Sequence, residues 1–279
     1  MFKARETTSW CPGCGNFPLR KALKDSLNEM DLNYEDVVMF TGIGQAAKMP
    51  HFLKINGYNG LHGRAIPPAV GMRIANPNIE VIVESGDGCS YGEGGNHFVH
   101  NMRRNLDIVH LVHNNQIYGL TKGQASPTSG TDIKTEVQPE GVTAQPLNPL
   151  RIALSSGATF VARSFVGDRE HLSKMIKKAS NHRGYALIDV LQPCVSFNKI
   201  NTYKWYSDRV ARLENHDKTD IDSAFHEAGK WGDEIPIGVF YQKERDVFRD
   251  HFPWLDNQEV ISERKIDPSD MDDLLRDFE

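Results

Sequence analysis

The sequence predicts an α/β fold with a doubly wound, mostly parallel sheet. Apolar runs typical of buried strands alternate with amphipathic helical stretches, and glycine-rich or polar turns follow several of the strands. Alternation of this kind joins parallel strands through crossover helices. A chain of 279 residues can bury a substantial core, so we expect one large domain with an extension rather than two independent domains.

The expected elements follow one another along the chain. After Gly15 a helix presents apolar side chains on one face, namely Leu19, Leu23, Leu27 and Met30. Strands are expected at 37–41, 79–85, 106–113, 158–163 and 185–191, and further helices at 65–75, 91–104, 149–155 and 169–180. Beyond Cys194 the pattern weakens and no clear sheet signal remains. We therefore expect a functional domain at 1–194 and a C-terminal extension at 195–279 that includes a short amphipathic helix at 269–278.

The most informative motif is Gly86-Asp87-Gly88, followed about one βαβ unit later by Asn114-Asn115. Both parts fall at the carboxyl ends of expected strands, where open α/β sheets bind ligands. Glycines let the backbone approach phosphate oxygens, and the Asp87 carboxylate and Asn115 amide oxygen suit a hard Mg²⁺ ion. A simple Asp-Gly turn beside an unrelated asparagine pair is the alternative. The strand context favours a magnesium diphosphate, and specifically thiamine diphosphate.

Charge and hydropathy exclude several kinds of partner. The formal net charge is −5 and no block rich in Lys and Arg stands out, so neither nucleic acid nor an anionic membrane is expected as a partner. The N-terminus lacks an apolar signal core, and no apolar run of about 18 residues is present to span a bilayer. We expect a cytoplasmic protein.

In a cytoplasmic protein, four cysteines favour metal ligands or buried thiols over a disulfide framework. Cys11-x-x-Cys14 places two sulfurs on one tight turn, where they suit a single metal centre. A thioredoxin-like redox pair is disfavoured because the polar segment upstream is too short for the expected strand and helix. Zinc or iron–sulfur binding needs further ligands, for which Cys89 and Cys194 are available. Four cysteines suffice for one 4Fe-4S cluster, although a buried inert thiol is the alternative for Cys194.

A dinucleotide-binding site is the main nucleotide alternative. Gly42-x-Gly44-x-x-Ala47 follows a strand and matches the dinucleotide fingerprint in its Ala form. That fingerprint expects an acidic residue about 20 positions further on to bind the ribose. Residues 38–79 contain no Asp or Glu, so a Rossmann NAD or FAD enzyme is disfavoured.

Several segments together resemble the β subunit of 2-oxoacid:ferredoxin oxidoreductases. They are Trp10-Cys-Pro-Gly-Cys-Gly15, Gly57-Tyr-Asn-Gly-Leu-His-Gly-Arg-Ala65, Gly86-Asp-Gly88, Arg103-Arg-Asn105 and Tyr118-Gly-Leu-Thr-Lys-Gly-Gln-Ala-Ser-Pro-Thr128. The resemblance covers about residues 10–194. It implies a subunit that binds thiamine diphosphate, Mg²⁺ and one 4Fe-4S cluster, with an α subunit that completes the active site. The extension is expected to pack on the core or on this α subunit. The implied reaction is coenzyme A-dependent oxidative decarboxylation of a 2-oxoacid, with electrons passing to ferredoxin.

The resemblance also assigns roles by position. The Mg²⁺ ligands it implies are Asp87, Asn115 and the backbone carbonyl of Ile117. The cofactor-binding positions it implies are Ile43, Gly44, Gln45, Ala46, His62, Gly88, Cys89, Gly119 and Leu120. His62 and Arg64 are expected to contact cofactor or substrate, against the alternative of a loop histidine and a solvated arginine.

One departure from the family concerns the cluster. The family's cluster cysteines match Cys11, Cys14 and Cys194, but Gln45 stands where the remaining cysteine is expected. Our hypothesis is that Cys89 replaces the missing sulfur, because both loops lie at the same edge of the sheet. Alternatively, three cysteines hold a labile cluster, or Gln45 or another group binds the iron.

Lys122 provides the clue to the substrate. It occupies a loop position that is glycine in many relatives that act on pyruvate or branched-chain acids, and its cation would suit a second carboxylate. A solvated loop lysine is the alternative. We expect 2-oxoglutarate to be favoured over pyruvate, with Leu120 shaping the pocket. Two other functions remain open: a non-redox thiamine diphosphate decarboxylase or synthase, and a cluster-bearing electron-transfer module.

Overall fold

The computed structural model describes residues 2, 7–252, 255, 260–263, 265, 269, 272, 275 and 276. An eight-stranded, mostly parallel sheet forms its centre, so the predicted α/β fold class is confirmed. In spatial order the strands are β2 (Asn56–Asn59), β1 (Val37–Thr41), β3 (Glu80–Gly86), β4 (Ile108–Asn114), β8 (Tyr185–Leu191), β7 (Phe160–Phe165), β10 (Ile235–Gln242) and β9 (Val210–Arg212). β10 is antiparallel to β7 and parallel to β9. The other neighbouring pairs are parallel.

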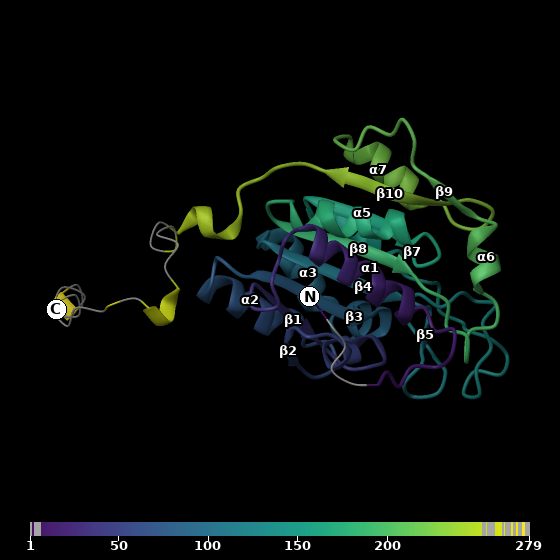
Figure 1. The fold of residues 1–279 in the computed structure, drawn as a ribbon. Coiled ribbons are helices and arrows are strands. Elements are labelled where there is room, and N and C mark those ends of the chain that lie inside the picture. The colour runs from purple at the N-terminus through teal and green to yellow at the C-terminus, as the bar shows by residue number, and fades with distance from the viewer. Residues whose placement is uncertain are drawn as a thin grey trace.

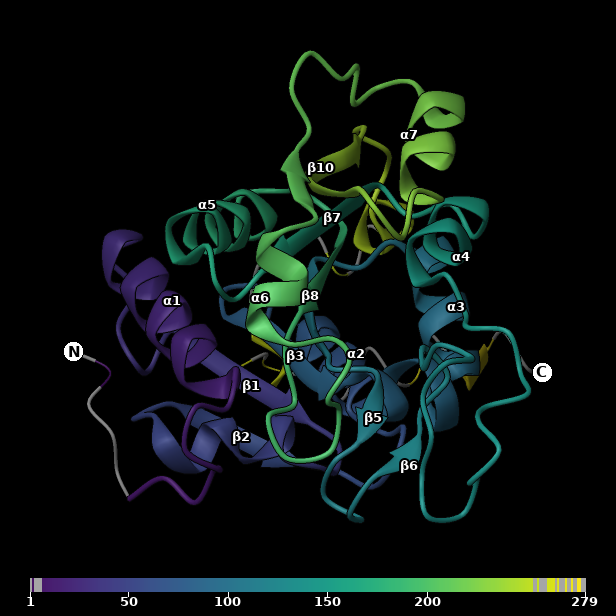
Figure 2. The same ribbon diagram turned by 90° about the vertical axis from the view of Figure 1, so that its right-hand side faces the viewer.

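Helices cover both faces of this sheet, as a doubly wound fold requires (Figures 1 and 2). One face carries α1 (Asn16–Glu29) and α5 (Arg169–Ser180), which pack against each other. The other face carries α2 (Ile66–Ala75), α3 (Gly95–Arg104), α4 (Pro149–Ser155) and α7 (Ile221–Ala228). None of the described helices is long and apolar enough to cross a membrane.

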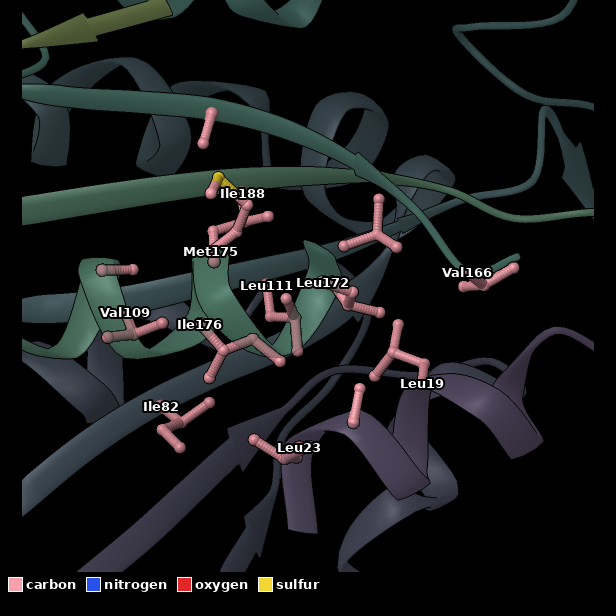
Figure 3. Packing of buried hydrophobic residues seen from close by; sticks show 14 of the residues in the cluster. Leu19, Leu23, Ile82, Val109, Leu111, Val166, Leu172, Met175, Ile176 and Ile188 are labelled. Carbon is pink, nitrogen blue, oxygen red and sulfur yellow. The ribbon is translucent and has the colours of Figure 1, made fainter. Parts of the chain in front are cut away.

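The core on the first face forms because each helix presents an apolar stripe to the sheet. Leu19 and Leu23 of α1 lie one turn apart, as do Leu172 and Ile176 of α5, and all four are buried against β3, β4 and β8 (Figure 3). Burial of each such side chain stabilises the fold by roughly 1.5–3 kcal/mol. The central strands are buried on both faces and accordingly read as nearly continuous apolar runs.

The elements expected up to residue 194 are found close to their predicted bounds, with one difference at the start of the expected helix at 91–104. A π-helical turn, η2 (Gly88–Glu93), comes first, and α3 begins only at Gly95. Glycines explain the break, because a Cβ at Gly94 would collide with the backbone oxygen of Cys89. A 3₁₀ helix, η1 (Ala46–Phe52), and the short exposed strand β2 follow β1 and were not expected.

The region after Cys194 contributes more to the sheet than its sequence pattern indicated. After the short helix α6 (Tyr203–Ser207), β9 and β10 add two strands, and β10 is buried along most of its length. Pro236 and Gly238 stand inside β10 and weaken its strand signal, because proline lacks a donor and glycine lacks a side chain to pack. Short 3₁₀ turns follow at η3 (Phe248–His251) and η5 (Ile261–Glu263). The helix expected at 269–278 falls largely outside the described residues.

We predict that buried His110 makes the fold acid-sensitive. Its ring nitrogens lie 3.1 Å from Ser90 Oγ and 2.7 Å from Tyr185 Oη, and burial lowers its pKa from 6.5 to about 3. Between these values the unfolded chain binds a proton that the folded chain does not, so stability falls as pH falls. In His110→Gln, the slope of unfolding free energy against pH, measured with urea from about pH 4 to 6, should decrease by up to about 1.4 kcal/mol per pH unit.

The exposed His100 is the matched control, since its ring is solvated. His100→Gln should leave the slope nearly unchanged. An unaltered slope in His110→Gln would show that His110 is protonated alike in the folded and unfolded states.

Candidate cofactor and cysteine site

Four neighbouring strands carry the predicted site residues to one edge of the sheet. β1 leads into residues 42–45, β3 into Asp87, β4 into Asn115, and β8 toward Cys194. Because these strands are parallel neighbours, their carboxyl ends meet at the same edge, where α/β proteins bind ligands. A small hairpin, β5 (Ile117–Tyr118) and β6 (Gln124–Ala125), lies beyond this edge (Figure 1).

Asp87 is a buried carboxylate held by two hydroxyl groups. Ser126 Oγ and Thr128 Oγ1 donate to Asp87 Oδ2 over 2.5 and 2.7 Å. Burial raises the Asp87 pKa from 3.8 to about 6, although these hydrogen bonds and the Gly88 backbone N–H act in the opposite direction. A cation beside Asp87 would restore the ionised form, so the carboxylate fits the expected Mg²⁺.

A cavity of about 50 Å³ lies beside Asp87 at the ends of β1, β3 and β4. Its lining includes every expected cofactor-binding residue, namely Ile43, Gly44, Gln45, Ala46, His62, Gly88, Cys89, Gly119 and Leu120, together with Asp87, Asn115 and Ile117. Arg64 is exposed and does not line this cavity. The volume is well below the roughly 300–1,000 Å³ of typical small-molecule sites.

The glycines of this cavity leave room for a phosphate group. Gly44 has a φ of 111°, in the left-handed region that favours glycine, and a Cβ at Gly44 or Gly86 would meet no other atom within 4 Å. In contrast, a Cβ at Gly88 would collide with the ring of Tyr118. The open space next to the Asp87 carboxylate therefore fits a diphosphate group.

A second cavity, of about 230 Å³, brings three of the four cysteines together. Cys11, Cys14 and Cys194 line it, but Cys89 does not. Instead Cys89 is buried in the first cavity, where its Sγ accepts a hydrogen bond from the Gly63 backbone N–H over 3.1 Å. Within the described part of the chain, no group of three His, Cys, Asp or Glu residues is arranged to hold a single metal ion. The ligands of a 4Fe-4S cluster bind different iron atoms and need not converge on one point.

The three thiols influence one another electrostatically. Burial raises the Cys14 pKa from 9.0 to about 11, a hydrogen bond from the Asn16 backbone acts in the opposite direction, and the charges of Cys194 and Cys11 raise the pKa further. Cys11 Sγ accepts a hydrogen bond from Ser196 Oγ over 3.1 Å, which ties the first turn to the segment after β8. A nearby cation would therefore favour the thiolate form of Cys14.

The two cavities share one wall. Gln45, Asn115, Gly119 and Leu120 line both of them. Lys122 lines only the cysteine cavity, next to Phe197 and Leu120. Its φ of 75° is in the left-handed region, which disfavours any residue with a side chain. Backbone strain of this kind is concentrated at functional sites.

Several residues that build the site had no assigned role in the sequence analysis. Ser126 and Thr128 fix Asp87, and Tyr118 Oη donates to Glu93 over 3.2 Å. Trp10 Nε1 donates to the backbone oxygen of Gln45 over 2.9 Å. Of the residues without an assigned role, all except Glu93 belong to the motifs that carry the family resemblance. Their contacts join segments far apart in the chain, so the motifs did not assign them roles.

Comparisons with known proteins agree with this geometry. Residues 37–190 match the family model "Thiamine pyrophosphate enzyme, C-terminal TPP binding domain", which defines the class of protein as a thiamine diphosphate enzyme. Residues 194–257 match the family model for the C-terminal part of the pyruvate ferredoxin oxidoreductase beta subunit. The chain belongs to the β subunits of the 2-oxoacid:ferredoxin oxidoreductases, as its motifs predicted, and it is therefore a subunit of an oxidoreductase.

Individual relatives cover between about three quarters and nearly all of the chain. The 2-oxoacid:ferredoxin oxidoreductase subunit beta of Saccharolobus solfataricus is 41% identical over 98% of this chain and 97% of its own length. The 2-oxoglutarate synthase subunit KorB of Methanocaldococcus jannaschii is 36% identical over 74% of this chain and 77% of its own. A solved 2-oxoglutarate:ferredoxin oxidoreductase from Magnetococcus marinus, with 2-oxoglutarate, coenzyme A and succinyl-CoA bound, has a TM-score of 0.92 at 32% identity and covers 98% of this chain and 94% of that chain.

We predict that Cys89 and Gly42 are coupled by packing. A Cβ at Gly42 would collide with Cys89 Sγ, so Gly42→Ala should destabilise the protein by about 1–3 kcal/mol. In Gly42→Ala/Cys89→Ala the collision is absent, so thermal unfolding should show that the double variant recovers part of the loss. If the losses of stability in Gly42→Ala and Cys89→Ala simply add in the double variant, the methyl group introduced at position 42 and Cys89 Sγ are not in contact.

Proposed function

We propose that this chain binds magnesium thiamine diphosphate in the first cavity and a 4Fe-4S cluster in the second, and works with an α subunit to oxidise a 2-oxoacid with ferredoxin as electron acceptor. The main observation in support of this proposal is that the two cavities share lining residues. With Gln45, Asn115, Gly119 and Leu120 lining both, electrons would leave the cofactor site through a single layer of residues. Family membership supports the same activity.

The residues of the first cavity suit the diphosphate end of the cofactor. Asp87, Asn115 and the Ile117 carbonyl would provide oxygen ligands to Mg²⁺, and the open space at Gly44 and Gly86 would take the phosphates. When bound, thiamine diphosphate supplies the electron sink for decarboxylation and the cluster supplies the route for single electrons. The protein contributes by positioning charge and excluding water.

The surface beside the cofactor cavity supports an α subunit as a neighbour. Large apolar side chains are exposed near this edge of the sheet: Leu61 is 74% exposed, Tyr58 52% and Leu120 41%. Leu61 precedes His62, which lines the cofactor cavity. Exposed apolar residues beside this cavity favour a subunit interface at this place. Coenzyme A and the 2-oxoacid would then bind between the two chains, as would be expected for an enzyme of this family.

Lys122 supports 2-oxoglutarate as the favoured substrate. Lys122 is exposed on the hairpin turn and lines the cysteine cavity, two residues after Leu120, which lines both cavities. Its positive φ does not favour a lysine there. A cation at this place would bind the carboxylate that distinguishes 2-oxoglutarate from pyruvate. The Magnetococcus marinus structure has 2-oxoglutarate bound.

The substrate assignment predicts selective loss in two variants. Lys122→Ala removes the cation but keeps the strained φ, whereas Lys122→Gly removes both, so Lys122→Gly should be at least as stable as Lys122→Ala. In the αβ enzyme, both should lose on the order of 10- to 100-fold in kcat/KM for 2-oxoglutarate, because a hydrogen bond to a charged group contributes about 1.5–3 kcal/mol. Pyruvate turnover should be nearly unchanged.

An exposed lysine on α5 provides the control for this prediction. Lys174→Ala should leave both substrates unaffected. Equal losses for pyruvate and 2-oxoglutarate in the Lys122 variants would remove Lys122 from this role.

The experiment that tests the proposed function is anaerobic purification with the α partner, followed by assays of iron, sulfide, thiamine diphosphate and 2-oxoacid-dependent ferredoxin reduction. We expect about four irons and one thiamine diphosphate per αβ unit, after any cluster of the α subunit is subtracted. Two variants should separate the sites. Asp87→Asn should lose thiamine diphosphate but keep iron, and Cys14→Ser should lose iron but keep thiamine diphosphate.

The same assays distinguish the alternatives. Thiamine diphosphate without iron would identify a non-redox decarboxylase or synthase. Iron without thiamine diphosphate would identify an electron-transfer module.

A further inference from the structure

Three thiols of the cysteine cavity need a fourth partner to complete a four-ligand cluster. Cys89 lies in the other cavity, so the candidates are the remaining polar side chains of the lining: Asn16, Gln45, Asn115, Lys122, Gln192 and Ser196. Lys122 is a cation, and Ser196 donates its hydroxyl to Cys11. The choice therefore falls among the four side-chain amides.

Two of these amide oxygens already accept a hydrogen bond, and one of them, Asn115 Oδ1, is also a proposed Mg²⁺ ligand. Asn16 Oδ1 accepts from Gln192 Nε2 over 2.8 Å, and Asn115 Oδ1 accepts from the Ile117 backbone N–H over 3.0 Å. The buried oxygens of Gln45 and Gln192 have no hydrogen-bond partner within the described part of the chain. Gln192 is held in place by its bond to Asn16 and by packing against Gly15, where a Cβ would collide with it.

The backbone of Gln45 is fixed against the turn that carries Cys11 and Cys14. Trp10 precedes this turn and Asn16 follows it, and both side chains donate to the Gln45 backbone oxygen, over 2.9 and 3.4 Å. Trp10 is in turn held by edge-on contacts with Phe17 and Phe52. A buried carbonyl oxygen without a donor is unfavourable by roughly 1–3 kcal/mol. Gln45 lines the cavity of the three thiols, so an iron atom bound there would give its oxygen a partner.

We propose that Gln45 Oε1 is the fourth protein ligand of the cluster, so that three thiolates and one neutral amide oxygen hold it. The inference rests on the proposed function, because it presupposes a cluster in this cavity. An amide oxygen is uncharged and binds iron more weakly than a thiolate. One iron is therefore exchangeable, and the reduction potential is higher than four thiolates would give.

The test compares variants at position 45 in the anaerobic αβ holoenzyme. Ferricyanide takes one electron from the [4Fe-4S]²⁺ cluster, and the resulting [4Fe-4S]³⁺ form releases Fe²⁺ to leave [3Fe-4S]⁺. The readouts are the rate of this iron loss, the EPR spectrum and the midpoint potential. Gln45→Cys should slow the loss and Gln45→Leu should accelerate it, each by at least about tenfold. Gln45→Cys should also lower the midpoint potential of the cluster. Gln45→Glu keeps an oxygen ligand, so its iron loss should be slower than that of Gln45→Leu.

Two matched variants test the rival ligands. Gln192→Leu and Cys89→Ser should resemble the unmodified enzyme in iron content and EPR spectrum. The inference is overturned if Gln45→Leu is indistinguishable from the unmodified enzyme, or if Gln192→Leu or Cys89→Ser alters the cluster instead. If the unmodified enzyme contains no iron, the proposed cluster itself is wrong. The iron content of the unmodified enzyme therefore distinguishes failure of the proposed function from failure of the Gln45 proposal. Intact folding of Gln45→Leu is checked by its thermal unfolding and its assembly with the α subunit.

Discussion

A buried chain of polar contacts that begins at Asp87 is the interaction on which the site depends. Asp87 accepts from Thr128, whose hydroxyl also lies 2.9 Å from Asn114 Oδ1, and Asn114 Nδ2 donates to Asp189 Oδ1 over 3.0 Å. Arg163 Nε lies 3.6 Å from the other oxygen of Asp189. These contacts connect the ends of β3, β4, β8 and β7, so the position of the carboxylate is set by the whole centre of the sheet. Because a buried charge is costly without a partner, the network stabilises an arrangement that a cation would complete.

The two cavities follow from this arrangement. Parallel neighbours end at one edge, and the loops that leave them enclose one cavity beside Asp87 and another beside the cysteines. Sharing a wall places the proposed electron donor next to the proposed acceptor without any conformational change. The same wall includes Gln45, whose side chain therefore faces the chemistry of both sites.

The exposed side of the site has the properties of an interface. The cofactor cavity is small, apolar side chains such as Leu61 are exposed near it, and Lys122 has an unfavourable backbone conformation on a hairpin turn. In an isolated chain, the exposed apolar side chains and the strained backbone of Lys122 are both energetically unfavourable. A second chain that covers this edge would bury the apolar groups and give the strained lysine a ligand, which agrees with membership of a family of β subunits.

The fold class, the family and the place of the Gly86-Asp87-Gly88 motif at the end of a strand could be predicted from the amino-acid sequence. These depend on local properties: apolar runs that alternate with amphipathic helices, and glycines that directly follow strands such as β3. The family resemblance grouped Cys194 with Cys11 and Cys14, and the structure places these three at one cavity. That Cys89 packs against Gly42 in the other cavity became visible only in the folded chain. The tertiary structure also decided that β10 enters the main sheet and that Ser126 and Thr128 hold Asp87. Contacts of this kind join residues far apart in the chain, and their outcome depends on which side chains fill the same space, which no local pattern encodes.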